Sequence, residues 1–141
     1  MKKILVATDG GPQSERVLEF AATIAEKFGS DVLALTVAPD LHGFGPPDLA
    51  DEQLKQEVNQ WAEQTARNAS EWLTQRGIAN AVPQTRKGHP AEEILAAAVD
   101  SNADCLILGT HSRRGIDRTL MGSIAEEVAR GCRIPLMFVP F

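Results

Sequence analysis

Short runs of almost purely apolar residues alternate along this chain with longer segments of helical periodicity. The runs at 3–8, 31–37 and 104–109 are apolar at nearly every position, which is typical of strands buried on both faces of a sheet. Helical segments separate them, at about 13–28, 50–75, from 90 onward, and 123–131. This alternation predicts an α/β fold, with a parallel sheet wound on both faces by helices.

Two further strands complete a predicted sheet of five. The segment 81–86 alternates in polarity and contains Pro83, which favours an edge strand. The last strand is expected at Leu136 to Val139. With the first strand in the centre, the predicted strand order is 3-2-1-4-5. The carboxyl ends of the first, second and fourth strands then share one rim, where ligands bind in such sheets.

Local signals set the helix boundaries. Gly29 and Gly77 are expected to end the first two helices, and Pro90 to open the third. The second helix carries a long apolar stripe, which predicts that both tryptophans pack in the core; its members are Leu54, Val58, Trp61, Thr65, Ala69, Trp72 and Leu73.

Length and composition narrow the class of protein. The chain has 141 residues, 43% of them hydrophobic, so we expect a single domain over residues 1–141. A net charge of −5 argues against nucleic acid as a partner, because such binding needs a basic surface. No apolar segment is long enough to predict membrane insertion. Cys105 and Cys132 fit neither a disulfide framework nor a metal cluster, so a reducing cytoplasm is expected.

The segment between the fourth strand and the last helix carries the strongest functional signal. It runs from Gly109 to Ser123 and contains further glycines and three arginines. A glycine-bearing turn before a helix gathers free backbone N–H groups at the positive end of the helix dipole. That arrangement binds phosphate, and arginines add forked donors.

Several ordered motifs resemble the universal stress protein family over the whole chain. They are Ile4 to Gly10, Val37 at the end of the second strand, Gly88-His89-Pro90-Ala91, Gly109-Thr110-His111, Gly122-Ser123, and Ile134 to Val139. The resemblance implies a cytoplasmic stress-response protein. It also implies a homodimer in which the strands Leu136 to Val139 of two chains meet antiparallel.

Nucleotide-binding members of that family carry Gly, two residues, Gly, nine residues, and then Gly with Ser or Thr. Gly109, Gly122 and Ser123 fit this pattern, whereas Ser112 stands in place of the second glycine. The resemblance implies ATP as the ligand, with or without magnesium. The site residues that it implies are Thr8, Asp9, Val37, Gly109, Thr110, His111, Ser112, Arg113, Gly122, Ser123 and Ile124.

The effect of Ser112 on binding has two opposite contributions. If the backbone there needs a positive φ, serine costs roughly 1–2 kcal/mol relative to glycine, or about tenfold in affinity. A serine hydroxyl that donates to an anion gains roughly 1.5–3 kcal/mol. The two effects are of similar size, so the sequence leaves the direction open.

Other site residues also have simpler structural interpretations. Ser123 and Glu126 form a capping-box pattern, so the serine hydroxyl could serve only as a helix cap. Asp9 could serve only the amides of its turn. The three arginines could form a solvated loop face, and His111 is read as a positioned loop residue. The segment 38–49 is either a lid over the rim or a plain connector.

The sequence contains no recognisable catalytic set. It has neither a Walker phosphate loop nor a Gly-x-Ser-x-Gly elbow, and Asp9 is the only candidate base near the rim. His42 and His89 lack metal-ligand spacing, so no metal site is expected. Three functions stay open: a nucleotide-binding regulatory protein with little or no turnover, an interaction module that binds no nucleotide, and a weak ATPase.

Overall fold

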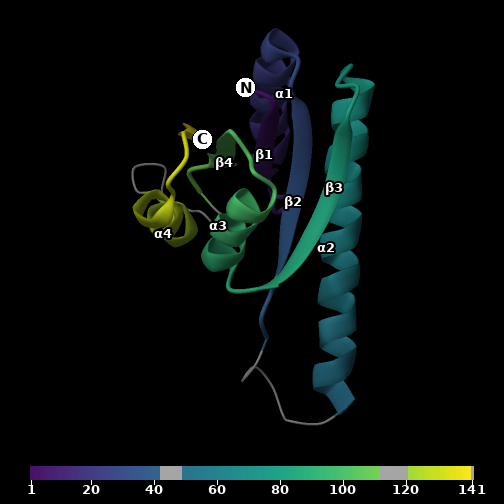
Figure 1. Ribbon diagram of the computed structural model, residues 1–141. Helices are drawn as coiled ribbons and strands as arrows, with labels where there is room; N and C mark the ends of the chain where they lie inside the picture. Colours follow the sequence, from purple (N-terminus) through teal and green to yellow (C-terminus); the bar gives the residue numbers. More distant parts are fainter. Residues whose placement is uncertain (42–48, 112–120, 141) are drawn as a thin grey trace.

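The computed structural model describes residues 1–41, 49–111 and 121–140, with only the backbone of 49–51. Strands and helices alternate throughout (Figure 1). The elements are β1 (Lys3–Ala7), α1 (Ser14–Phe28), β2 (Asp31–Pro39), α2 (Leu49–Gln75), β3 (Ala81–Gly88), α3 (Pro90–Asp100), β4 (Cys105–Gly109), α4 (Ser123–Gly131) and β5 (Leu136–Val139).

The five strands form one sheet in the order β3-β2-β1-β4-β5, and every pair is parallel. The central strand β1 pairs on both sides, so that Val6 lies opposite Ala34 of β2 and Ile107 of β4. The predicted fold class and strand order are therefore confirmed. The carboxyl ends of β1, β2 and β4 lie at one edge of the sheet.

Alternate residues of each strand supply two separate cores, one on each face of the sheet. Ile4 and Val6 point to the face that α1 and α2 cover, where Leu73 of α2 is fully buried. Leu5 points to the opposite face and packs with residues of α3 and α4, such as Val128. The alternation follows from the pleat of the strands, and it explains why β1 has no polar position between Ile4 and Ala7.

The long helix α2 covers the sheet with small side chains. Its fully buried face consists of Ala62, Ala66 and Leu73, with Ala69 almost as deep. At 1.5 Å per residue a helix of 27 residues is about 40 Å long, whereas the nine residues of β2 span about 30 Å. The first turns of α2 therefore extend past the ends of the strands (Figure 1).

The position of Trp61 corrects one prediction about the core. Trp72 is half-buried and packs against the core beneath α1 and α2, as expected. Trp61 was predicted to do the same, but it belongs to neither core cluster. The prediction was wrong because helical periodicity shows which face of a helix is apolar and does not show whether each residue of that face meets the core or a cavity.

The element boundaries follow the predictions closely, with two larger differences. Gly29 ends α1 in a left-handed conformation with φ of 64°, as the sequence indicated. The strands β2 and β3 each continue two residues past their predicted ends, to Pro39 and Gly88, because they pair with each other up to these residues. No helix in the described part of the chain is both long enough and apolar enough to cross a membrane.

Candidate functional site

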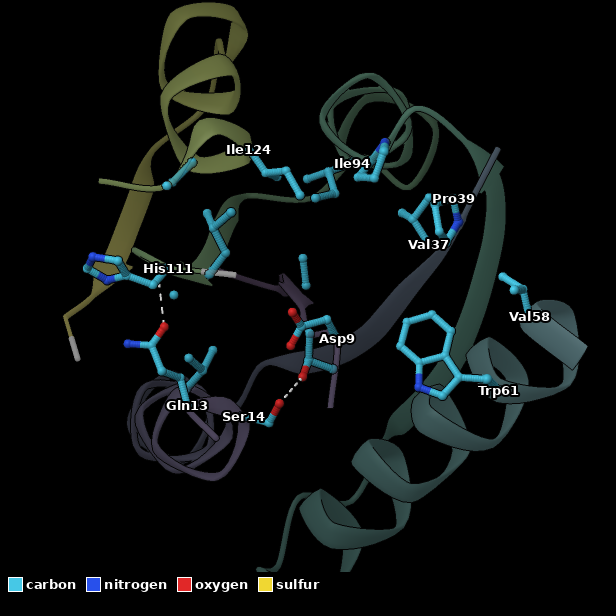
Figure 2. Close-up of a pocket in the computed structure, with 18 of the residues that line it drawn as sticks. Asp9, Gln13, Ser14, Val37, Pro39, Val58, Trp61, Ile94, His111 and Ile124 are labelled. Atoms are coloured by element: carbon cyan, nitrogen blue, oxygen red, sulfur yellow. Dashed lines mark hydrogen bonds between the residues drawn. The ribbon is translucent and has the colours of Figure 1, made fainter. Parts of the chain in front are cut away.

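A cavity of about 810 Å³ opens at the carboxyl edge of the sheet. Its walls come from the ends of β1, β2 and β4 and from the N-terminal halves of helices α1 to α4 (Figure 2). Seven of the predicted site residues line it: Thr8, Asp9, Val37, Gly109, His111, Gly122 and Ile124. Thr110 and Ser123 adjoin these residues without lining the cavity.

The turn after β1 is held by its own polar side chains. The hydroxyls of Thr8 and Ser14 lie 2.7 Å apart, and Gly10 N–H donates to Thr8 Oγ1 at 3.2 Å. Gly11 N–H donates to Asp9 Oδ1 at 2.9 Å, so this carboxylate has the turn-stabilising role considered above. Because Asp9 also lines the cavity, the turn contact positions its carboxyl group beside a prospective ligand.

The segment after β4 is anchored on both sides. Thr110 N–H donates to Val139 O of β5 at 3.2 Å, and Thr110 Oγ1 lies 2.8 Å from His111 Nδ1. His111 N–H donates to Gln13 Oε1 at 3.2 Å, as the dashed line in Figure 2 marks. A Cβ atom on Gly109 would lie 3.0 Å from the same oxygen, so a larger residue there would have to displace the Gln13 side chain.

Gln13 was missed by the sequence analysis. It lines the cavity and links α1 to the segment after β4, which lies almost a hundred residues further along the chain. A glutamine at the start of an amphipathic helix has no distinctive pattern, and its role depends on a tertiary contact. No local signal in the sequence could have identified it.

The helix α4 begins differently from the prediction. Gly122 is the N-cap, with an extended backbone at φ of −66° and ψ of 156°, and no side chain caps the helix. Ser123 is already the first helical residue, so the predicted capping box is wrong. Among the described residues no acceptor meets the backbone N–H groups of Ser123, Ile124 and Ala125. These three amides are the natural anion-binding group of a helix N-terminus.

The charges around the cavity are mainly negative. The carboxyl groups of Asp9, Asp40 and Glu57 belong to lining residues, and no lysine or arginine lines the cavity within the described parts of the chain. The predicted site residues Ser112 and Arg113 lie outside the described residues, as do most of the predicted lid, at 42–48. The described residues include no cluster of three or more metal-ligating side chains.

The N-terminal half of α2 forms the apolar wall of the cavity. Leu54, Val58 and Trp61 all line it, although the sequence analysis placed them in a core-facing stripe. Trp61 also lines a second cavity of about 490 Å³, between α1 and α2, together with Trp72. Trp61 therefore stands at the boundary between the two spaces.

A contact between α3 and α4 joins two walls of the main cavity from outside. His89, the residue before α3, places its Nε2 2.7 Å from Glu127 Oε2 of α4. Both side chains are about half exposed. This hydrogen bond raises the pKa of His89 above its usual value, because the carboxylate favours the protonated ring.

The sequence also matches a family model, described as the universal stress protein family, over residues 1–140. The chain belongs to the universal stress protein family. One curated relative, universal stress protein MJ0531 of Methanocaldococcus jannaschii, is 32% identical over 98% of this chain and 81% of its own length. The solved structure of universal stress protein UspA from Lactobacillus plantarum shares the fold, with a TM-score of 0.86 and 20% identity over 98% of this chain and 97% of that one.

Two structural neighbours in the family contain a nucleotide. One is a universal stress protein in complex with cAMP, at a TM-score of 0.75, 22% identity, and coverage of 98% of this chain and 96% of that one. The other, from Archaeoglobus fulgidus, is in complex with dAMP, at a TM-score of 0.65 and 23% identity, with 98% and 97% covered. At these identities the likeness shows the fold alone, but both ligands contain adenine.

Proposed function

We propose that this universal stress protein binds an adenine nucleotide, with ATP as the main candidate, in the cavity at the carboxyl edge of the sheet. The observation that carries the proposal is the meeting of four chain segments around one cavity: the ends of β1, β2 and β4, and the first turn of α4. A volume of about 810 Å³ lies within the usual range for small-molecule sites, roughly 300–1,000 Å³.

The phosphates would lie at the start of α4. The amides of Ser123, Ile124 and Ala125 meet no acceptor among the described residues, and the helix dipole adds partial positive charge there. Gly122, the N-cap, carries no side chain that would compete for these amides. The resemblance to nucleotide-binding family members assigns the same segment to phosphate.

We include magnesium in the proposal because the charged residues that line the cavity are negative. A polyphosphate near Asp9, Asp40 and Glu57 would meet like charges, and no lysine or arginine among the described lining residues offsets them. Mg²⁺ is usually held by one or two carboxylates together with substrate phosphates, which fits this surrounding. Arg113, which the sequence assigns to the site, would add a cation from the segment outside the described residues.

Calorimetric titration of the purified protein with ATP tests the proposal, once with magnesium and once with EDTA. We expect heat of binding in the presence of magnesium and an affinity at least about tenfold lower without it, or about 1.4 kcal/mol. No heat and no thermal shift at millimolar ATP would contradict nucleotide binding. Phosphate release measured on the same samples would be slow or absent, in keeping with a regulatory role.

The same titration decides the alternative, an interaction module that binds no nucleotide. One observation favours it: two N–H groups of the proposed phosphate segment are already bonded within the protein, His111 to Gln13 and Gly122 to Thr110 O at 2.7 Å. A Gln13→Ala variant frees the His111 amide. If only this variant bound ATP, the natural protein would be the interaction module.

We also propose a homodimer through β5. This strand pairs with β4 on one side, and no strand pairs with its other side in the described residues. Leu136, Met137 and Phe138 are only partly buried, and an open strand edge normally needs protection or a partner. Light scattering at about tens of micromolar should give the mass of a dimer, whereas the mass of one chain would contradict this arrangement.

A further inference from the structure

Trp61 differs in its surroundings from Trp72, the other tryptophan of α2. It lies in the N-terminal half of the helix, and it lines both of the cavities that border this helix. It belongs to neither core cluster, whereas Trp72, three turns further on, packs against one of them. An aromatic residue of this size is therefore held at the wall of a cavity.

The ring of Trp61 points from α2 into the main cavity, toward the side where Asp9 and Val37 lie (Figure 2). Leu54 and Val58 line the same wall, and Pro39 lines the cavity from the end of β2. Among the described lining residues, Trp61 is the only one with an aromatic hydrocarbon ring; the imidazole of His111 comes from the segment after β4. The α2 side of the cavity is thus apolar and aromatic, whereas the α4 side offers backbone amides.

The two sides suit the two ends of a nucleotide. A flat base gains from stacking on an aromatic face, and such contacts change affinity by roughly 5- to 150-fold per base. The phosphates need backbone donors, which α4 supplies. Resting on the proposed nucleotide function, we propose that Trp61 is the stacking platform for the base and thereby fixes the orientation of the ligand across the cavity.

Intrinsic fluorescence gives a direct test, because the chain has two tryptophans, Trp61 and Trp72. In a Trp72→Phe variant all indole emission comes from Trp61, and in a Trp61→Phe variant it comes from Trp72. Titration with magnesium and ATP should quench or shift the emission of the first variant and leave that of the second almost unchanged. Inorganic tripolyphosphate, which has no base, should change neither.

Affinity provides the second readout. Calorimetry should show that Trp61→Ala weakens ATP binding about tenfold and leaves tripolyphosphate binding unchanged, and that Trp61→Phe recovers much of the loss. Circular dichroism melting of each variant checks that the fold is kept, and the emission of the Trp72→Phe variant serves as the test if Trp61→Ala does not fold.

The outcomes separate the two proposals. If ATP binds the natural protein but Trp61→Ala binds it equally well and the emission of Trp61 does not change, the stacking role is wrong and nucleotide binding stands. An equal loss of ATP and tripolyphosphate affinity would also overturn it, because the residue would then support the cavity as a whole. If the natural protein binds no ATP, both proposals fall.

Discussion

The two edges of the sheet differ in whether their polar groups are hydrogen-bonded within the protein. At the amino edge, the Asp104 carboxylate accepts hydrogen bonds from the backbone N–H groups of Lys2 at 2.7 Å and Lys3 at 2.9 Å. The Lys3 ammonium donates to Ser101 O, and the Ser30 hydroxyl to Met1 O. At the carboxyl edge, a cavity stands in the corresponding place, and the first amides of α4 meet no acceptor among the described residues.

The difference indicates that the two ends of the strands serve different purposes. The strand β1 begins at the edge where side chains bond the backbone, and it ends at the turn that lines the cavity. The helix α2 shows the same division, with buried alanines and Leu73 in its C-terminal half, and Leu54, Val58 and Trp61 of its N-terminal half at the cavity wall. Substitutions at the two edges should therefore affect different properties, stability at one and ligand binding at the other.

The largest expected effect compares two leucines of α2. Leu73→Ala removes a fully buried side chain and should lower the free energy of unfolding by about 2–5 kcal/mol. Leu54 is 40% exposed at the cavity wall, so Leu54→Ala should change the free energy of unfolding by less than about 0.5 kcal/mol. Guanidinium denaturation measures both, and similar losses would mean that the N-terminal half of α2 is part of the core.

Ser123→Asp should separate stability from binding. A carboxylate in the first turn of α4 interacts well with the helix dipole and should stabilise the fold by about 0.3–1 kcal/mol. The same charge repels phosphates at the proposed site, and we expect ATP affinity to fall about tenfold. Ser123→Asn is the matched neutral control. If calorimetry shows unchanged ATP affinity in the aspartate variant, the phosphates do not bind at the start of α4.

A smaller effect is expected from acid at the amino edge. The hydrogen bonds from Lys3 and Lys2 N–H lower the pKa of Asp104 below its ordinary value of 3.8. Its contribution to stability is therefore present above about that pH and is lost as the pH falls through the lower folded-state value. Asp104→Asn should be less stable than the natural protein at about pH 7, and the gap should close in acid. A constant gap in urea denaturation would exclude the carboxylate as the cause.

The smallest expected effect concerns His89 and Glu127. The pKa of His89 is raised above 6.5, so the contact stabilises the protein fully below that pH, and the benefit is lost as the pH rises through the folded-state value. Both side chains are about half exposed, which keeps the gain small. Melting of His89→Gln should differ from the natural protein at about pH 5.5 and match it at about pH 8.5. A difference at about pH 8.5 and none at about pH 5.5 would contradict a stabilising contact between protonated His89 and Glu127.

The sequence was sufficient to predict the sheet and most of the residues at the cavity rim. Apolar runs and helical periods predicted the alternation of strands and helices. With the first strand placed in the centre, the predicted strand order brings Asp9, Val37 and Gly109 to one edge. Details that depend on tertiary geometry were beyond it. The contact of Gln13 with His111 joins residues far apart in the sequence, and the position of Trp61 at a cavity wall depends on how α2 packs against the rest of the fold.

The start of α4 shows a different reason for failure. Ser123 and Glu126 have the spacing of a capping box, but the backbone enters the helix one residue earlier, with Gly122 as the N-cap. Sequence patterns locate helix ends only to within one or two residues. At this position such a shift changes the serine from a cap into a first-turn residue.

The most direct test of the account is an NMR titration of uniformly ¹⁵N-labelled protein with magnesium and ATP, followed through the backbone amide signals. The account predicts that the largest shifts fall on Ser123, Ile124 and Ala125 and on the turn after β1 at Thr8 and Asp9, while Lys2 and Lys3 at the amino edge stay unchanged. Shifts confined to the amino edge, or shifts on the β1 turn with none in the first turn of α4, would contradict it.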